Sequence, residues 1–226
     1  MLANPVFVGL DTTDLATAAV LGRTVRPHVG GLKLGLQFFM ANGPAGVRAI
    51  AEIGLPIFLD VKLHDIPNTV AGALKSLACL DLHMVNVHAG GGAAMLAAAR
   101  EACPATTKLI AVTVLTSLDD DDLGAMGVGG GSAAQVARLA GLARAAELDG
   151  VVCSPHEVAA LHSAWPEGDF VVPGIRPAGS EAGDQKRVMT PAAALAAGAT
   201  MLVVGRPITG AADPAAAAAA ISASLS

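Results

Sequence analysis

Residues 57–69 have the sequence IFLDVKLHDIPNT, which places three charged side chains after a short apolar segment. The apolar segment predicts a buried β-strand, and Pro67 indicates that the chain has left the strand by that point. Because side chains alternate along a strand, Asp60 and Lys62 are expected on the same side, with Asp65 beyond them in a loop. Two carboxylates and an ammonium group at one strand end predict a functional site.

The order of strand, polar end and helix recurs along the whole chain. Strand-like runs are expected at residues 5–10, 29–35, 56–62, 84–89, 108–115, 150–154, 169–174 and 200–205. Helix-like segments are expected at residues 14–25, 44–53, 68–80, 93–102, 133–148, 155–164, 191–197 and 214–225. Eight strands that are each followed by a helix predict an α/β protein, a (β/α)8 TIM barrel with its active site at the C-terminal rim of the strands. No linker is apparent, so residues 1–226 are expected to form a single domain.

An open, doubly wound sheet is the competing architecture. Its dinucleotide-binding form needs a Gly-x-Gly-x-x-Gly turn after the first strand, whereas residues 9–14 read GLDTTD. The alanine-rich segment 215–220 looks low in complexity, but Asp213 and Pro214 before it form a helix start signal. That segment is therefore expected to be the last outer helix of the barrel.

Composition excludes several classes of protein. The net charge of −5, with no Tyr and one Trp, provides neither a basic surface nor a stacking platform for nucleic acid. No apolar run reaches the roughly 18 residues of a membrane span, and the N-terminus lacks a secretory signal, so a cytoplasmic protein without membrane contact is expected. Cys79, Cys103 and Cys153 are widely spaced in apolar segments and are interpreted as reduced packing residues.

Seven polar residues and one glycine lie at the ends of the predicted strands, where a parallel barrel brings them to one rim. The residues are Asp11, Lys33, Asp60, Lys62, Thr116, Arg176, Gly205 and Arg206. Loops after the seventh and eighth strands often hold phosphate, and the two arginines lie on these loops. Gly205 would let a phosphate approach the backbone, and Pro207 is expected to open a short helix. Gln185 lies in the polar stretch 178–186, which has the composition of a mobile lid.

These features also have structural interpretations. The charges at residues 60–65 could form an ion-pair network that closes the barrel, and the arginines could be ordinary surface residues. His64, His88 and His156 have no metal-binding spacing and are interpreted as structural. The four aspartates at 119–122 predict a solvated loop, and the glycines at 129–131 are expected to lead into the next helix.

The motif Asp-x-Lys-x-x-Asp followed by Ile-Pro-Asn-Thr-Val, at residues 60–70, resembles the signature of the orotidine 5'-phosphate decarboxylases. The resemblance covers almost the whole chain and includes Asp11, Lys33, Thr116, Arg176, Gln185, Gly205 and Arg206. It implies a carbon–carbon lyase that converts orotidine 5'-phosphate to uridine 5'-phosphate and carbon dioxide. This reaction is the last step of de novo pyrimidine nucleotide synthesis, and the resemblance implies that it needs no metal or other cofactor.

The resemblance also implies roles for the charged residues near the reacting carbon. Lys62 would protonate C6 of the pyrimidine, and Asp60 would lie against the departing carboxylate. Lys33 would brace this array and, with Asp11, reach the ribose.

Further roles follow from the same resemblance. Thr116 and its neighbour Ser117 would meet the base. The phosphate would be held by Arg176, Gln185, Gly205 and Arg206. A homodimer is implied, in which Asp65, Ile66 and Thr69 of each subunit enter the partner's site.

Two rival functions remain open on the sequence alone. A magnesium-dependent sugar-phosphate decarboxylase or aldolase of the same barrel type shares the Asp-x-Lys-x-x-Asp motif. Such relatives carry an acidic metal ligand at the position of Lys33, and an ammonium group there disfavours a divalent cation. The other rival is a non-catalytic nucleotide-binding barrel that keeps the phosphate contacts without the chemistry.

Overall fold

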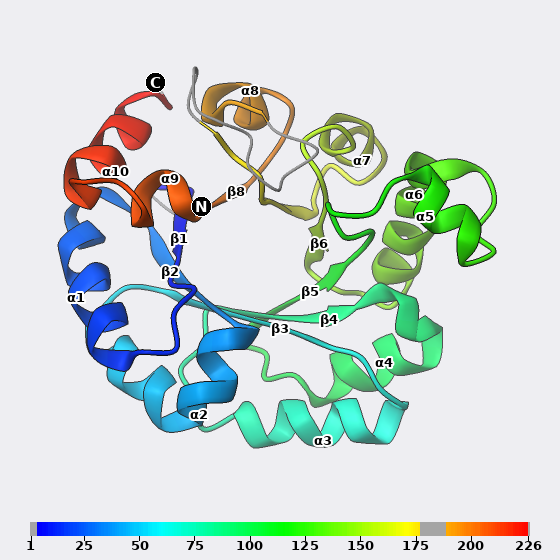
Figure 1. Cartoon of the computed structure of the whole chain (residues 1–226). Coiled ribbons are helices and arrows are strands. Elements are labelled where there is room, and N and C mark those ends of the chain that lie inside the picture. Colours follow the sequence, from blue (N-terminus) through cyan, green and yellow to red (C-terminus); the bar gives the residue numbers. More distant parts are fainter. Residues whose placement is uncertain (1–3, 177–188, 226) are drawn as a thin grey trace.

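The computed structural model describes residues 4–176 and 189–225. Its eight strands are parallel and close into a barrel in sequence order, because β8 pairs with β1. Figure 1 looks along the barrel, with the strands inside a ring of helices. The strands are β1 Val6–Gly9, β2 Gly31–Gly35, β3 Ile57–Leu63, β4 Met84–His88, β5 Lys108–Val112, β6 Gly150–Val152, β7 Asp169–Val172 and β8 Met201–Val204. The predicted TIM barrel is confirmed.

Each predicted helical region contains a helix. The α-helices of the described residues are α1 Leu15–Val25, α2 Leu36–Ala51, α3 Pro67–Leu77, α4 Gly92–Ala102, α5 Asp120–Ala125, α6 Gly131–Ala145, α7 Val158–Ala164, α8 Pro191–Ala196, α9 Arg206–Thr209 and α10 Pro214–Ala223. Single 3-10 turns occur at Arg26–His28 and Ala89–Gly91. None of these helices has the length and apolar character of a segment that spans a bilayer.

Local capping explains where several helices begin. The side chain of Asp14 accepts a hydrogen bond from the Thr17 amide at the start of α1. At the start of α8, the side chain of Thr190 accepts one from the Ala193 amide. Asp213 caps α10 and Pro214 is its first residue, as predicted. Pro207 lies in the first turn of α9, so the short helix expected after Gly205 is also confirmed.

Two helices differ from the prediction. Helix α2 begins at Leu36, eight residues before the predicted start, and contains a kink at Gly43, where φ is 57° and ψ is −162°. The predicted segment, residues 44–53, lies after this kink, and the helical segment before the kink was not predicted. The aspartates at 119–122 were predicted to be a loop, which is wrong: Asp119 and Asp122 form a reciprocal capping box, and α5 begins there.

The core has two layers. Inside the barrel lies a plug of apolar side chains, namely Phe7, Phe58, Met84, Ile110, Val171, Met201 and Val203. A larger layer fills the space between the strands and the outer helices. Gly31 makes room for the plug, because a Cβ atom there would lie 2.2 Å from the ring of Phe7. The plug therefore packs the interior of the barrel with apolar side chains.

Candidate active site

A cavity of about 450 Å³ opens at the C-terminal ends of the strands. Its described walls include all eight rim residues that the sequence predicted, Asp11, Lys33, Asp60, Lys62, Thr116, Arg176, Gly205 and Arg206. Phe58, Val171 and Val203 belong both to the cavity wall and to the interior plug, so the plug forms the cavity floor. The structure thus brings the predicted residues of six different strands and loops to one site.

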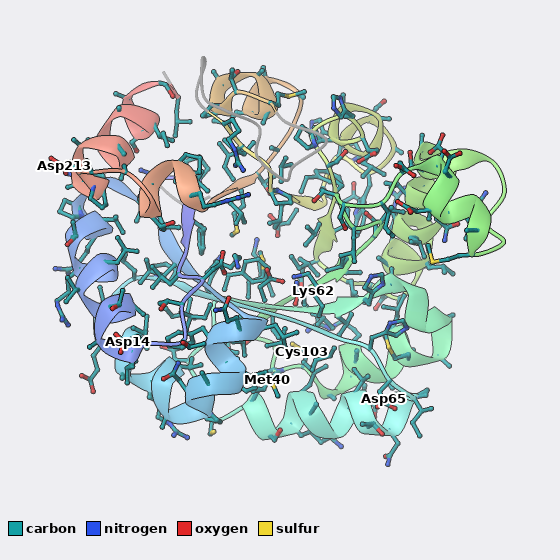
Figure 2. The ribbon with its side chains drawn as sticks, in the orientation of Figure 1. Asp14, Met40, Lys62, Asp65, Cys103 and Asp213 are labelled. Atoms are coloured by element: carbon teal, nitrogen blue, oxygen red, sulfur yellow. The ribbon has the colours of Figure 1, made fainter. Side chains whose placement is uncertain are left out.

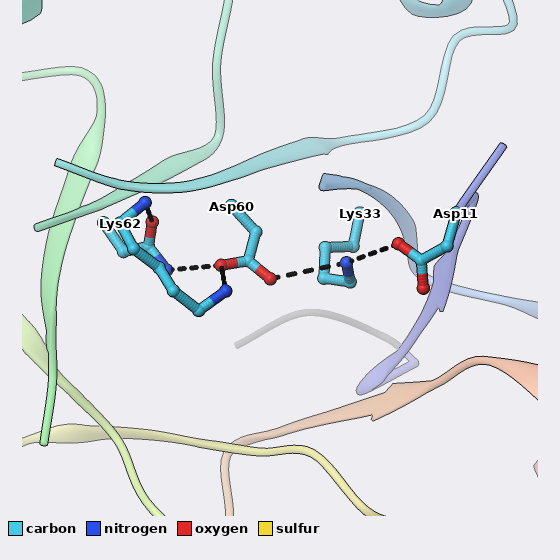
Figure 3. Close-up of polar contacts among 5 residues, drawn as sticks. Asp11, Lys33, Asp60 and Lys62 are labelled. Atoms are coloured by element: carbon cyan, nitrogen blue, oxygen red, sulfur yellow. Dashed lines mark hydrogen bonds and ion pairs between the residues drawn. The ribbon is translucent and has the colours of Figure 1, made fainter. Parts of the chain in front are cut away.

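Four of these residues form a chain of alternating charge across one wall (Figure 3). Lys33 Nζ lies 3.0 Å from Asp11 Oδ1 and 3.3 Å from Asp60 Oδ2. The other carboxylate oxygen of Asp60, Oδ1, lies 2.5 Å from Lys62 Nζ. Gly35 leaves space for this chain, because a Cβ atom there would lie 2.9 Å from Asp11 Oδ1. The predicted pairing of Lys33 and Lys62 with Asp60 is confirmed.

Burial and charge oppose each other in this array. Burial alone would raise the pKa of Asp60, but the ammonium groups of Lys33 and Lys62 and a hydrogen bond from Asn86 outweigh it, so the pKa lies below its usual value. Burial alone would lower the pKa of Lys33, but Asp60 and Asp11 reverse the effect, so that pKa is raised. Both groups are therefore held in their charged forms at neutral pH.

The backbone at Lys62 departs from the expected strand. Lys62 has a φ of 51°, in the left-handed region that non-glycine residues rarely adopt. The pairing of β3 with β4 also shifts register between Leu59 and Leu63. Simple alternation was therefore the wrong reason for placing Lys62 beside Asp60, although the two side chains do meet.

Asn86 is a site residue that sequence reasoning missed. Its side chain is fully buried, its Oδ1 accepts the backbone N–H of Lys62 at 2.8 Å, and its Nδ2 donates to Asp60 Oδ1 at 2.7 Å. A signal was present in the sequence, since Asn86 is a polar residue within the apolar run of β4. It lies two residues after Met84 of the interior plug and so points to the same side of the strand. An amide at an inward-facing strand position needs partners inside the barrel.

One guanidinium group, that of Arg176, lies on the loop after β7, and the other, that of Arg206, belongs to the first residue of α9, directly after β8 and Gly205. Burial and the neighbouring charge of Arg206 lower the pKa of Arg176. Both arginines line the cavity, and two cations in one cavity wall indicate a site for an anion. Thr116 lines the same cavity, whereas its exposed neighbour Ser117 is not among the described lining residues. The predicted phosphate ligand Gln185 lies outside the described residues.

Asp65, Ile66 and Thr69 are exposed and lie apart from the cavity of their own chain. Figure 2 shows Lys62 within the barrel and Asp65 at its outer edge. The Asp65 carboxylate accepts the adjacent Ile66 amide at 2.6 Å, and none of the ion pairs of the described residues includes it. The sequence motif therefore does not form a complete charged cluster within one chain.

The histidines and cysteines are arranged as follows. His64 stacks on His88 with ring centroids 5.1 Å apart, and in the described residues no three His, Cys, Asp or Glu side chains are grouped to hold a metal. Cys103 and Cys153 are buried, as predicted for packing residues. Cys79 is exposed, so its interpretation as a packing residue was wrong.

Comparisons with known proteins agree with this arrangement. The family described as "Orotidine 5'-phosphate decarboxylase / HUMPS family" matches residues 4–221. The chain is 58% identical to an orotidine 5'-phosphate decarboxylase of Novosphingobium aromaticivorans, over 99% of this chain and 100% of that one. It is 55% identical to one of Sphingopyxis alaskensis, again over 99% and 100%. The crystal structure of orotidine 5'-phosphate decarboxylase from Lactobacillus acidophilus is similar, with a TM-score of 0.86, 39% identity and coverage of 98% of this chain and 99% of that one.

Proposed function

Because the chain belongs to the orotidine 5'-phosphate decarboxylase / HUMPS family, we propose that it decarboxylates orotidine 5'-phosphate to uridine 5'-phosphate without a cofactor. The observation that carries the proposal is the chain of charge Asp11, Lys33, Asp60 and Lys62 along one wall of the cavity. Arg176 on the loop after β7 and Arg206 at the start of α9 add two positive charges to the cavity wall, which suits an anionic nucleotide. The reaction would be the last step of de novo pyrimidine nucleotide synthesis.

Lys62 and Asp60 act at the reacting carbon. The bond between C6 and the carboxylate carbon breaks, its electron pair stays at C6, and carbon dioxide leaves as a neutral molecule. Lys62 Nζ then transfers a proton to C6 and regains one from solvent. The ammonium group is held 2.5 Å from Asp60 before substrate arrives, so it is already oriented when negative charge develops at C6.

The ionised side chain of Asp60 repels the carboxylate of the substrate. A carboxylate set about 4 Å from Asp60 would be repelled by about 4 kcal/mol at an effective dielectric constant near 20. Loss of carbon dioxide relieves that repulsion. The effect amounts to about three powers of ten in rate, so most of the acceleration must come from the oriented ammonium group and from binding of the remote phosphate.

The phosphate and ribose occupy the remaining walls. Arg176 and Arg206, together with Gly205 and Gln185, hold the phosphate, and Asp11 and Lys33 face the ribose. Thr116 meets the base. Binding energy from the phosphate fixes the pyrimidine against Lys62, because the two ends of the nucleotide are contacted by opposite parts of the rim.

A homodimer completes the site. Asp65, Ile66 and Thr69 are exposed on the loop after β3 and the first turn of α3. They are not among the described residues that line the cavity of their own chain. Leu36 and Met40, on the neighbouring helix α2, are 53% and 76% exposed, and Ile66 is 67% exposed. Such apolar side chains are typical of a surface covered by a second subunit, which would bring Asp65 to the partner's Lys62 array. The phosphorylated substrate does not cross membranes unaided, so we place the enzyme in the cytoplasm.

The magnesium-dependent rival is disfavoured by the position of Lys33. Its ammonium group lies within 3.3 Å of carboxylate oxygens from both Asp11 and Asp60, which are the ligands that a divalent cation would use. A metal ion could reach these oxygens only if both ion pairs of the Lys33 ammonium group broke. The non-catalytic rival is disfavoured because a protein that only binds a nucleotide has no need for a buried carboxylate held ionised between two ammonium groups.

Turnover of orotidylate, followed by its ultraviolet absorbance, tests the function. We expect the native protein to be active and to remain active with a chelator, and Lys62→Ala to lose at least about 1,000-fold in kcat because the proton donor is missing. Uridine monophosphate should still bind the variant. Abolition by the chelator would support the magnesium-dependent rival, and equal rates of native and variant protein would remove Lys62 from the mechanism.

A further inference from the structure

The left-handed backbone of Lys62 needs a cause. A non-glycine residue at a φ of 51° is strained by roughly 1 kcal/mol or more, and it persists only where neighbouring contacts hold it. The register shift between β3 and β4 takes Lys62 out of regular ladder pairing at this point. The N–H of Lys62 bonds instead to the side chain of Asn86, at 2.8 Å.

The amide of Asn86 can fit here in only one orientation. The Lys62 N–H can only donate and the ionised Asp60 carboxylate can only accept, so Oδ1 must face the former and Nδ2 the latter. The oxygen of Asp60 that accepts from Nδ2 at 2.7 Å also accepts from Lys62 Nζ at 2.5 Å. One buried side chain therefore contacts the backbone of the proton donor and the carboxylate that orients its ammonium group.

We propose that Asn86 is a positioning residue for the decarboxylation, which fixes the backbone of Lys62 and the carboxylate of Asp60 so that the ammonium group points at C6. This inference rests on the proposed function. Without the amide, the Lys62 N–H would lose its hydrogen-bond partner, and the strain of the left-handed backbone would favour a return to an extended strand. That change would redirect the Lys62 side chain, while the phosphate and ribose contacts would stay in place.

The expected signature is a loss of rate and of recognition at C6, with substrate affinity preserved. Asn86→Leu removes both hydrogen bonds, and the isosteric Asn86→Asp keeps an acceptor for Lys62 but loses the donor to Asp60. We expect kcat to fall by about 50-fold or more in each, with KM changed less than about threefold. Thr107→Val is the matched control, because it removes a buried hydrogen bond to the Leu82 carbonyl at the opposite end of the barrel.

Ligand binding separates positioning from simple structural support. Uridine monophosphate should bind native protein and both Asn86 variants alike, whereas an analogue with an ionised oxygen at C6 should lose at least about tenfold in affinity. In a Lys62→Ala background, Asn86→Leu should cost little further affinity for that analogue, because the two residues act through one contact. Thr107→Val should keep native kcat and native preference for the analogue.

The outcomes are distinct. If both Asn86 variants keep native kcat, or lose affinity for the two nucleotides equally, the positioning role is wrong while the decarboxylase function stands. A crystal structure of Asn86→Leu with Lys62 still at a positive φ would also overturn it. If the native protein itself neither turns over orotidylate nor binds uridine monophosphate, the proposed function fails and this inference fails with it.

Discussion

His88 is a residue whose protonation opposes the folded state. Burial, then the neighbouring charges of His64 and Lys62, lower its pKa. Its Nδ1 accepts a hydrogen bond from the Gly90 amide, which also requires that nitrogen to be unprotonated. The imidazole is therefore neutral in the folded protein at pH values where the unfolded chain already binds a proton.

The sign of the pH dependence follows directly. Well above pH 6.5, the ordinary pKa of histidine, the group is neutral in both states and contributes no slope. As pH falls below that value, the unfolded chain takes up the proton first, and stability is lost until the pH passes the lowered pKa of His88. We expect His88→Asn, which keeps an acceptor for Gly90, to reduce the fall in unfolding free energy between pH 7 and pH 5.5, as measured by urea denaturation.

The comparison contains its own control. Between pH 7.5 and pH 8.5 the two proteins should show the same slope, because the imidazole is neutral in the folded and unfolded chains. An unchanged slope in the acid range would mean that His88 does not carry this effect.

At the scale of single residues, the sequence predicted which residues belong to the site better than it predicted how they are arranged. The charges after β3 were found because ionised groups at the end of an apolar strand are costly unless they serve a site. The left-handed Lys62 and its partner Asn86 were not predicted, because they depend on the register between two strands. Register is a tertiary property that the motif itself does not contain.

Gly43 determines the shape of helix α2. Its φ of 57° and ψ of −162° lie in a region that is nearly exclusive to glycine, and a Cβ atom there would have no neighbour within 4 Å. Gly43→Ala is therefore expected to lower the free energy of unfolding by about 1–3 kcal/mol through backbone strain alone. Gly141, inside helix α6, has equally open surroundings without a positive φ.

The matched variant Gly141→Ala should have the opposite effect. Alanine restricts the unfolded chain more than glycine does, so a gain of about 0.5–1 kcal/mol is expected in a helix interior. Chemical denaturation of the two variants measures both values. If the two substitutions shift stability in the same direction, the conformation of Gly43 is not what limits that position.

At the scale of elements, helix starts were predictable where a capping residue precedes proline, as at Asp213. The first half of α2 was missed because Gly35 and Gly43 bracket a short segment that has no such signal. Helix α5 was missed because four consecutive aspartates suggest solvation, whereas two of them satisfy the first backbone amides of a helix. In both cases a local contact outweighed composition.

At the scale of the whole molecule, the barrel was predictable because each of the eight predicted strands is followed by a predicted helix. Closure of β8 onto β1 then follows from the strand count, and it brings residues far apart in sequence to one rim. The sequence motif did not indicate whether one chain holds all of the predicted site residues in one cavity. Within one chain Asp65 lies at the outer edge of the barrel, apart from Lys62, so the fold of one chain supplies only part of the predicted constellation.

Mixed dimers test where Asp65 acts. Lys62→Ala and Asp65→Asn should each be nearly inactive as homodimers, because every site lacks one of the two groups. In a mixed dimer, the site with Lys62 from the Asp65→Asn chain would receive Asp65 from the Lys62→Ala chain, and would be fully native. Random mixing makes half of the dimers mixed, each with one native site of two, so about one quarter of native activity should return after subunit exchange.

The recovered activity should require exchange of subunits and not mere mixing. Combining the two variants without an unfolding and refolding step should leave activity low at first, with a rise only as dimers dissociate and reassociate. If Asp65 instead served the cavity of its own chain, every site in a mixed dimer would still lack one group, and no activity would return at any ratio. Cross-subunit sharing of the charged array would then be wrong, and the exposed loop that carries Asp65, Ile66 and Thr69 would need another explanation.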